Sequence, residues 1–169
     1  LERLPAAQIG VSVRDPHKAK DLADRGVRVR RGDFGQGDGL AHAFEGADRI
    51  LLVSSNSSGE DAVRHHRTAI DAARSAGARH VFYTSHVGAS PGSPFAPMPD
   101  HAATEEALRA SGVPFTSLRN GFYADSAMLI VGPAIQSGVL ATPADGPFSW
   151  TAHSDLAEAT AILMTAEAP

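Results

Sequence analysis

The fold is decided by residues 78–123, which read ARHVFYTSHVGASPGSPFAPMPDHAATEEALRASGVPFTSLRNGFY. Residues 80–85 predict a buried strand, 100–111 an amphipathic helix and 115–120 a second strand. Buried strands that alternate with helices form parallel sheets, in which each helix is a crossover. Both strands end in small polar residues, and open parallel sheets bind ligands beyond their carboxyl ends. We therefore expect functional residues directly after the strands.

The same alternation extends to both sides of this stretch. The remaining expected elements are strands at 8–13, 27–31, 50–53, 138–140 and 148–150, and helices at 17–25, 40–44, 60–76, 127–137 and 155–165. The strand at 50–53 is fully apolar, which is typical of a sheet centre, and Ser154 or Asp155 is expected to cap the last helix. This order predicts an α/β fold with a doubly wound parallel sheet in residues 1–120, followed by a smaller lobe in 121–169.

Bulk composition excludes several classes of protein. The chain has 169 residues, a formal net charge of −4 and no long basic run, so we expect no nucleic-acid partner. It has no cysteine, which excludes disulfides and thiolate metal sites. We also expect no membrane span, no signal peptide and a cytoplasmic location.

Six short motifs occur along the chain in a fixed order. They are Val13–Pro16 (VRDP), Gly32–Phe34 (GDF), Leu52–Ser55 (LVSS), His80–Ser85 (HVFYTS), His101 with Thr104 and Glu105, and Leu118–Gly121 (LRNG). Together they resemble the NmrA-like atypical short-chain dehydrogenase/reductases, and within them the NADPH-dependent quinone oxidoreductase branch. The resemblance implies NADP(H) as cofactor, an incomplete NAD(P)-binding Rossmann-like domain in 1–120 and part of a substrate-binding lobe in 121–169.

The opening strand and glycine-rich turn of this family are expected to be missing. Residues 1–5 look like the end of a helix, and the turn Gly35–Gly39 fails the G-x-G-x-x-G spacing because Leu40 stands at the third glycine position. We interpret that turn as a helix-entry loop. The chain looks like a fragment or a naturally shortened member of the family.

Four residues near the first two strands are candidates for the adenosine end of the cofactor. Arg14 can clasp a 2′-phosphate through two hydrogen bonds and Lys18 can add charge; the alternative is that Arg14 pairs with Asp15. Asp33 can accept from the adenine amino group and Phe34 can pack on the ring. An equally good interpretation makes Asp33 a helix N-cap, although Asp38 could take that role.

Polar residues after the later strands are candidates for the rest of the cofactor. Ser54, Ser55 and Asn56 follow the apolar strand, and Thr84 and Ser85 end the next one. The resemblance places Asn120 near the nicotinamide and the substrate. A simple turn is the alternative for the first three, since Ser and Asn favour turns.

The usual proton donor of short-chain dehydrogenases, a Tyr with a Lys four residues later, is absent. Val87 stands four residues after Tyr83, and Ala127 four residues after Tyr123. His101, expected at a helix start, and Tyr123 are therefore the candidate catalytic donors. An exposed helix-start histidine is the alternative for His101.

Other histidines and aromatics have simpler interpretations. We assign structural roles to the histidines at 42, 65, 66, 80 and 153, because no metal-binding spacing occurs. Phe122, Tyr123 and Trp150 form either an aromatic wall for a flat acceptor or ordinary core.

The function that these residues predict is an NAD(P)H-binding oxidoreductase that reduces a quinone or similar carbonyl acceptor with NADPH. One alternative is a non-catalytic, NADP-sensing regulator that acts on a partner protein. A further alternative is an inactive fragment, because the glycine turn supplies the main backbone donors to the pyrophosphate. A small-molecule substrate is expected in the first case, and the oligomeric state stays open.

Overall fold

A computed structural model describes residues 2–140 and 150–166 of the chain. The chain divides into two compact units, Leu1–Leu118 and Arg119–Pro169. The elements in order are β1 (Gly10–Val13), α1 (Lys20–Asp24), β2 (Arg28–Arg31), α2 (Leu40–Phe44), β3 (Arg49–Leu52), α3 (Glu60–Ser75), β4 (His80–His86), α4 (Pro97–Ser111), β5 (Phe115–Asn120), β6 (Phe122–Tyr123), α5 (Ala127–Ser137), β7 (Trp150–Thr151) and α6 (His153–Thr165). Short 3-10 helices cover Ala6–Gln8, Pro16–Ala19 and Ala124–Ser126.

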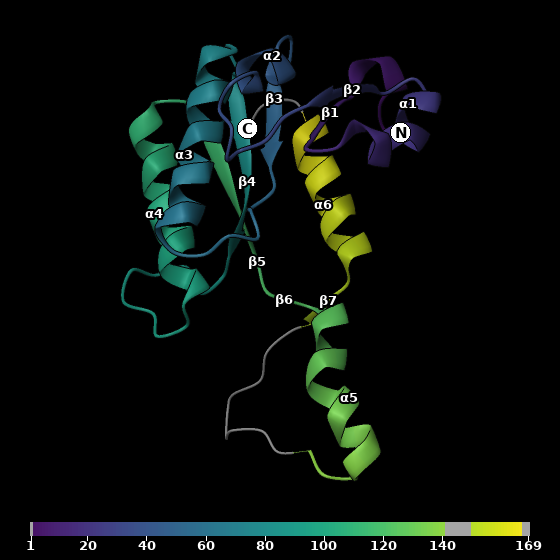
Figure 1. The fold of residues 1–169 in the computed structure, drawn as a ribbon, viewed down its shortest axis with the longest axis vertical. Coiled ribbons are helices and arrows are strands. Elements are labelled where there is room, and N and C mark those ends of the chain that lie inside the picture. The colour runs from purple at the N-terminus through teal and green to yellow at the C-terminus, as the bar shows by residue number, and fades with distance from the viewer. Residues whose placement is uncertain (1, 141–149, 167–169) are drawn as a thin grey trace. The chain divides into compact units, whose positions relative to one another are not determined.

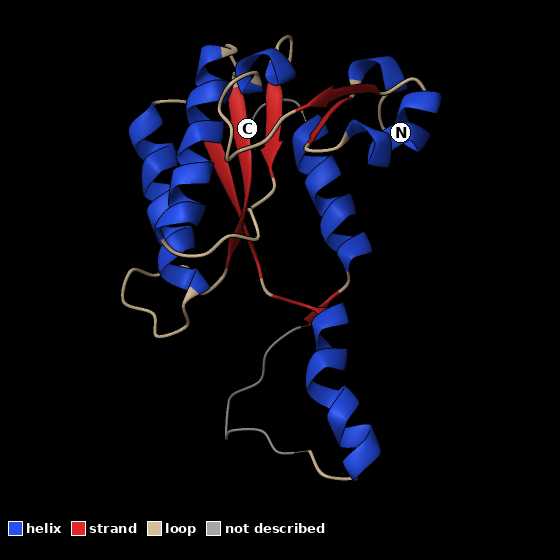
Figure 2. Cartoon of the chain, viewed as in Figure 1, coloured by secondary structure: helices blue, strands red, loops and turns tan. Residues whose placement is uncertain are grey.

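The first unit contains two parallel pairings, as the alternating pattern predicts (Figure 2). β1 pairs with β2 so that Val13 lies opposite Arg31, and β3 pairs with β4 so that Leu52 lies opposite Tyr83. β5 is hydrogen-bonded to the other side of β4. The two sheets match the segments 3-2 and 4-5-6 of the doubly wound order 3-2-1-4-5-6.

The main core lies between the three-stranded sheet and two long helices. α3 and α4 lie side by side over one face of β3–β4–β5 (Figure 1). Leu52 and Tyr83 from the strands are buried there against Ile70 of α3 and Leu108 of α4. Val81, Tyr83 and Ser85 share one face of β4 and are buried, and Phe82 on the opposite face is buried as well. The sheet therefore holds its carboxyl ends at one rim beside the first turns of α3 and α4.

The second unit is small and is described by itself. β6 and β7 form a short parallel pair with Phe122 opposite Trp150, and their rings lie 5.6 Å apart. α5 contains Pro133 and ends at Ser137, and its C-cap Gly138 adopts a left-handed conformation. Within the described residues no helix combines the length and apolar character that crossing a membrane requires.

Several element boundaries differ from those predicted. Residues 2–5 contain a bend at 3 and 4 and no helix, and 8–13 divides into the end of a 3-10 turn and β1. The predicted helix 17–25 is a 3-10 turn followed by α1, and α4 begins three residues before Asp100. Residues 138–140 are not a strand, while 148 and 149 lie outside the described residues. The middle of the three-stranded sheet is β4, whereas the sequence had favoured the strand at 50–53.

The predicted helix caps are also wrong. The N-cap of α6 is Ala152 and that of α2 is Gly39, and neither residue makes a side-chain capping bond. Asp38 and Asp33 therefore do not cap α2, and Ser154 and Asp155 lie inside α6. The backbone of Gly39 has φ +87°, which explains a glycine where an Asp, Ser or Asn cap would be expected.

Candidate functional site

Side-chain hydrogen bonds join the carboxyl ends of β3 and β4. The Ser54 backbone N–H donates to Thr84 Oγ1 at 2.8 Å, and Thr84 Oγ1 donates to Ser54 Oγ at 3.3 Å. Asn56 is exposed, whereas Ser55 Oγ is buried and has no hydrogen-bond partner within the described residues. The structure thus brings Ser54, Ser55 and Thr84 together at one rim, where Asn56 is the side chain most open to solvent.

A buried histidine extends this rim into the helix layer. His66 of α3 is 3% exposed. Its Nε2 accepts the Ser55 N–H at 2.9 Å, and its Nδ1 lies 2.8 Å from Thr104 Oγ1 of α4. Burial, followed by nearby His101 and His65, lowers the pKa of His66 to about 4, although Asp100 opposes the shift. His66 is therefore neutral near pH 7.

A second histidine lies against the same strand. Tyr83 of β4 is fully buried, and its Oη lies 2.9 Å from Nδ1 of His101. The ring of His86 stacks on His101 with centroids 6.3 Å apart. Burial lowers the pKa of His101, and His86 lowers it further, whereas Asp100 and Glu105 raise it. His101 lies inside α4, half-buried and hydrogen-bonded, so it is not the exposed helix-start residue considered above.

The first turns of α4 hold two further parts of the rim. Ser85 Oγ donates to Glu105 Oε1 at 2.7 Å, and both residues are buried. The Gly59 N–H donates to Asp100 Oδ2 at 2.7 Å, which ties the residue before α3 to α4. Gly59 has φ +63°, a conformation that favours glycine at this entry turn. Ser85 therefore joins the strand to the helix layer and does not lie open at the surface.

The carboxyl end of β1 carries exposed positive charge. Arg14 and Lys18 are exposed, and neither makes an ion pair within the described part of the chain. Asp15 instead accepts the His17 N–H at 3.1 Å and caps the short 3-10 turn. The alternative of an Arg14–Asp15 pair is therefore not what the structure contains. The Gly32 N–H donates to Val13 O, so Arg14 lies next to the end of β2.

The loop after β2 reaches the loop after β3. Asp33 Oδ1 accepts the Gly35 N–H at 2.9 Å, and Phe34 is half-buried against the main core. A Cβ added to Gly35 would lie 3.2 Å from His65 Nε2, and His65 Nδ1 lies 3.1 Å from Ser57 Oγ. The loop after β2 thus lies beside His65 of α3, which in turn contacts the loop after β3. Asp33 is brought to the rim, while Phe34 contributes mainly to packing.

Asn120 and Tyr123 belong to the second unit. Asn120 ends β5 and is half-buried. The Tyr123 ring packs on His153 with centroids 4.6 Å apart, and His153 Nδ1 lies 2.6 Å from Asp125 Oδ2. Within this unit the neighbours of Tyr123 are thus the His153 ring and, beyond it, the Asp125 carboxylate.

The sequence prediction missed the polar residues of the helix layer. His66 was given a structural role without partners, and Asp100 and Thr104 were given none. One signal could have found His66: it lies four residues after Ala62 and four before Ile70, on the buried face of α3. A polar side chain on such a face requires hydrogen-bond partners.

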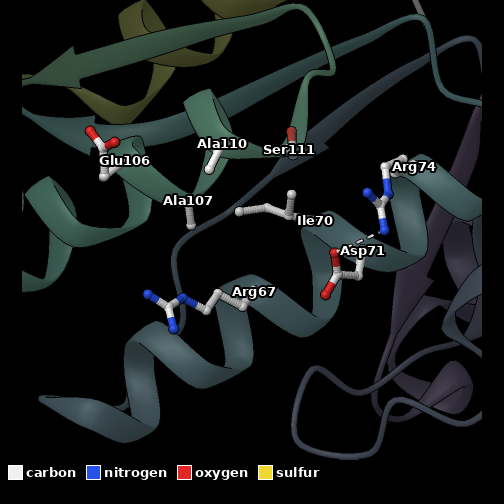
Figure 3. A pocket seen from close by; sticks show the side chains of 8 residues that line it. All are labelled: Arg67, Ile70, Asp71, Arg74, Glu106, Ala107, Ala110 and Ser111. Atoms are coloured by element: carbon white, nitrogen blue, oxygen red, sulfur yellow. Dashed lines mark ion pairs between the residues drawn. The ribbon is translucent and has the colours of Figure 1, made fainter.

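A separate hollow lies between α3 and α4 (Figure 3). It has a volume of about 260 Å³ and is lined by Arg67, Ile70, Asp71, Arg74, Glu106, Ala107, Ala110 and Ser111. Asp71 and Arg74 pair with each other across 3.8 Å, and the strand-end residues described above do not line the hollow. We therefore place the candidate site at the strand ends and not here.

Comparisons with known proteins agree on one family. The family model described as NAD(P)H-binding matches residues 2–161. The chain is 36% identical over 166 residues to quinone oxidoreductase 2 of Escherichia coli strain K12, covering 98% of this chain and 57% of that protein. It is also 31% identical to an NmrA-like family domain-containing oxidoreductase of Aspergillus flavus, covering 97% of this chain and 55% of that protein.

Solved structures agree with these relatives. The crystal structure of the NADPH-dependent quinone oxidoreductase from Escherichia coli in complex with NADPH matches with a TM-score of 0.89 and 35% identity, covering 97% of this chain and 58% of that chain. A Citrobacter triphenylmethane reductase in complex with NADP(H) matches with a TM-score of 0.86 and 34% identity, covering 99% and 60%. The chain thus spans a little over half the length of these relatives. The predicted Rossmann-like α/β class is confirmed, and the chain belongs to the NAD(P)H-binding family and is similar to NmrA-like oxidoreductases.

Proposed function

We propose that the whole protein is an NADPH-dependent oxidoreductase that reduces a quinone or a similarly flat, conjugated acceptor. The observation that carries this proposal is the cationic end of β1: Arg14 and Lys18 are exposed and without ion pairs in the described residues. A free guanidinium beside a strand end suits a 2′-phosphate, because it donates two parallel hydrogen bonds. The relatives named for quinone, triphenylmethane dye and azo compound reduction support an acceptor with an extended π-system.

The residues present fit a dinucleotide along the rim. Arg14 and Lys18 would hold the 2′-phosphate, and Asp33 would accept from the adenine amino group. The backbone of Ser54–Asn56 and Thr84 would line the sugar and phosphate region. Asn120 of the second unit is kept as the candidate for the nicotinamide end on the resemblance alone. NADPH, when bound, supplies a hydride from nicotinamide C4.

His101 is the proposed proton donor within the first unit. Tyr83 occupies its Nδ1, which leaves Nε2 without a hydrogen bond in the described part of the chain. In the tautomer whose Nδ1–H donates to Tyr83 Oη, Nε2 would take a proton from solvent and pass it to the oxygen of the reduced acceptor, which returns the ring to its neutral form. A quinone suits this arrangement because it accepts hydride without a strong acid. Tyr123 is the second proposed donor, from the second unit.

The test compares two arginines. Arg14→Ala is expected to weaken NADPH binding by about 10- to 100-fold while changing NADH binding little, because charge-assisted bonds to the 2′-phosphate are lost. Arg79→Ala is the matched control, since Arg79 is exposed, pairs with Asp48 and precedes the amino end of β4. Calorimetric titration measures both, and equal losses for NADPH and NADH would refute the assignment of Arg14.

A regulatory role is the second candidate, and it is favoured by the lack of a lysine four residues after either tyrosine. Turnover decides between the two. NADPH oxidation by the whole protein with a simple quinone supports catalysis. NADPH binding without oxidation, together with capture of a partner protein, supports the sensing role.

A further inference from the structure

The loop that joins β3 to α3 is held by side chains from three different elements. Backbone N–H groups of Ser54, Ser55 and Gly59 donate to side chains of β4, α3 and α4, respectively. The acceptors are Thr84 Oγ1, His66 Nε2 and Asp100 Oδ2. A loop without a strand partner normally leaves such groups to water. Here the loop backbone instead has a fixed position relative to both helices.

His66 has only one protonation state that satisfies its neighbours. Its Nε2 must accept, because the Ser55 backbone N–H can only donate. Thr104 Oγ1 donates its own proton to the Asp100 backbone oxygen at 2.8 Å, so it can only accept from His66 Nδ1–H. The hydrogen bonds therefore run in one direction, from Ser55 through His66 and Thr104 to Asp100. Protonated His66 would present a second N–H to the Ser55 N–H and break this chain.

The same residues connect the loop to the candidate donor. Asp100 immediately precedes His101 on α4, and its carboxylate holds Gly59 at the far end of the loop. His66 also packs edge-on against Tyr83 with ring centroids 5.3 Å apart, and Tyr83 contacts His101. Packing of this kind fixes side-chain positions within the low-mobility core.

We propose that His66 is a positioning residue: held by Thr104, which is bonded to the Asp100 backbone, it fixes the Ser55 backbone and with it the shape of the loop that would line the sugar and phosphate region of the bound dinucleotide. This inference rests on the proposed function. His66 itself would not touch the nucleotide. His66 keeps the loop in one conformation before the nucleotide binds. The conformational entropy that binding would otherwise cost is therefore smaller.

Two amide variants separate the two bonds of the imidazole. In His66→Gln the longer side chain can place its Oε1 where Nε2 lies, so the acceptor for Ser55 remains. In His66→Asn the shorter amide can reach only the Nδ1 position, so the acceptor for Ser55 is lost. His80→Asn is the control, because His80 lies at the amino end of β4 and bonds to Thr116 away from the loop.

NADPH titration of the whole protein and amide hydrogen exchange at Ser55 provide the two measurements. We expect His66→Asn to raise the Kd for NADPH by about tenfold or more and to lose Ser55 protection, because a buried donor is left unpaired. His66→Gln should restore both to within about threefold of the parent protein, and His80→Asn should change neither.

The outcomes are distinguishable. Normal NADPH affinity in His66→Asn, or equal weakening in both amide variants, overturns the positioning role while leaving the proposed function intact. A parent protein that does not bind NADPH refutes the proposed function and the nucleotide half of this inference together. Ser55 exchange that is the same in the parent and both variants overturns the hydrogen bond on which the inference depends.

Discussion

We expect acidification to lower the free energy of unfolding through protonation of His66. A substitution of His66 measures how much of the loss is due to this residue. Burial lowers the pKa of His66 from the usual 6.5 to about 4. The unfolded chain therefore binds more protons than the folded one between these two values, so the free energy of unfolding falls as the pH decreases through that window. A pKa that moves from 6.5 to about 4 corresponds to about 3 kcal/mol when the window has been crossed completely.

His66→Gln removes this titration and keeps an acceptor for Ser55. We expect the loss of unfolding free energy between pH 7 and pH 4.5 to be about 2 kcal/mol larger in the parent protein than in the variant, since most of the window is crossed by then. Urea unfolding at both pH values measures each loss. The histidines at 80, 86 and 101, whose pKa values are also lowered, are present in both proteins and cancel in the difference.

The reasoning is refuted if the two proteins lose the same unfolding free energy on acidification. A direct check is available from the imidazole itself. Its ring signals in a magnetic-resonance titration should keep their neutral positions until the pH approaches 4. A ring that titrates near 6.5 in the folded protein would show that burial does not penalise its charge.

Two further changes test the candidate donor and the contact between β1 and β2. His101→Ala should lower the rate of quinone reduction by about tenfold or more with little change in NADPH affinity, because its imidazole acts on the acceptor; a rate equal to that of the parent protein would remove His101 from the mechanism. Gly32→Ala should lower the free energy of unfolding by about 1–3 kcal/mol, because the new Cβ collides with Ser12 Oγ, whereas Gly92→Ala, which meets nothing within 4 Å, should not; thermal melting compares the two, and equal stabilities would argue against the close approach.

Hydrophobic patterning predicted most of the first unit. The bounds of α2 and β5, and those of α5 in the second unit, were predicted to the residue, because glycines and small polar residues end each apolar pattern sharply. The start of α4 was missed since Pro97 and Pro99 were assigned to the preceding loop. Proline is tolerated in the first turn of a helix, where its missing N–H would have no partner, so the prolines belong to α4 instead.

Helix caps were harder to predict because a capping bond depends on the backbone conformation before the helix. Asp38 has the right chemistry and a suitable place in the sequence for α2. Gly39 adopts a left-handed conformation instead, and the chain enters α2 without any side-chain cap. The spacing of residue types in the sequence does not predict the φ angle of Gly39. The predicted cap of α2 therefore lies one position before the N-cap Gly39, and the predicted caps of α6 lie two and three positions after the N-cap Ala152.

For the candidate site, the sequence likewise predicted which strand ends come together but not which side chains bond to each other. The rule for parallel sheets placed Ser54 and Thr84 at one rim, and the structure joins them by hydrogen bonds. That rule concerns strand ends and contains nothing about the facing helices. His66 and Thr104 meet across 38 positions of sequence, and Gly59 and Asp100 across 41. Contacts of this kind depend on how two helices pack against one sheet, which patterning does not determine.

The buried chain of hydrogen bonds also explains why a histidine is suited to position 66. The site requires an acceptor for Ser55 and a donor for Thr104 on opposite sides of one rigid side chain. A neutral imidazole supplies both from a planar ring, whereas an apolar residue would leave two buried groups unpaired, at about 1–3 kcal/mol each. The same requirement excludes the charged ring. The sequence suggested a structural role for His66. That role also contributes to nucleotide binding, because the loop that His66 supports is the surface on which the nucleotide is proposed to lie.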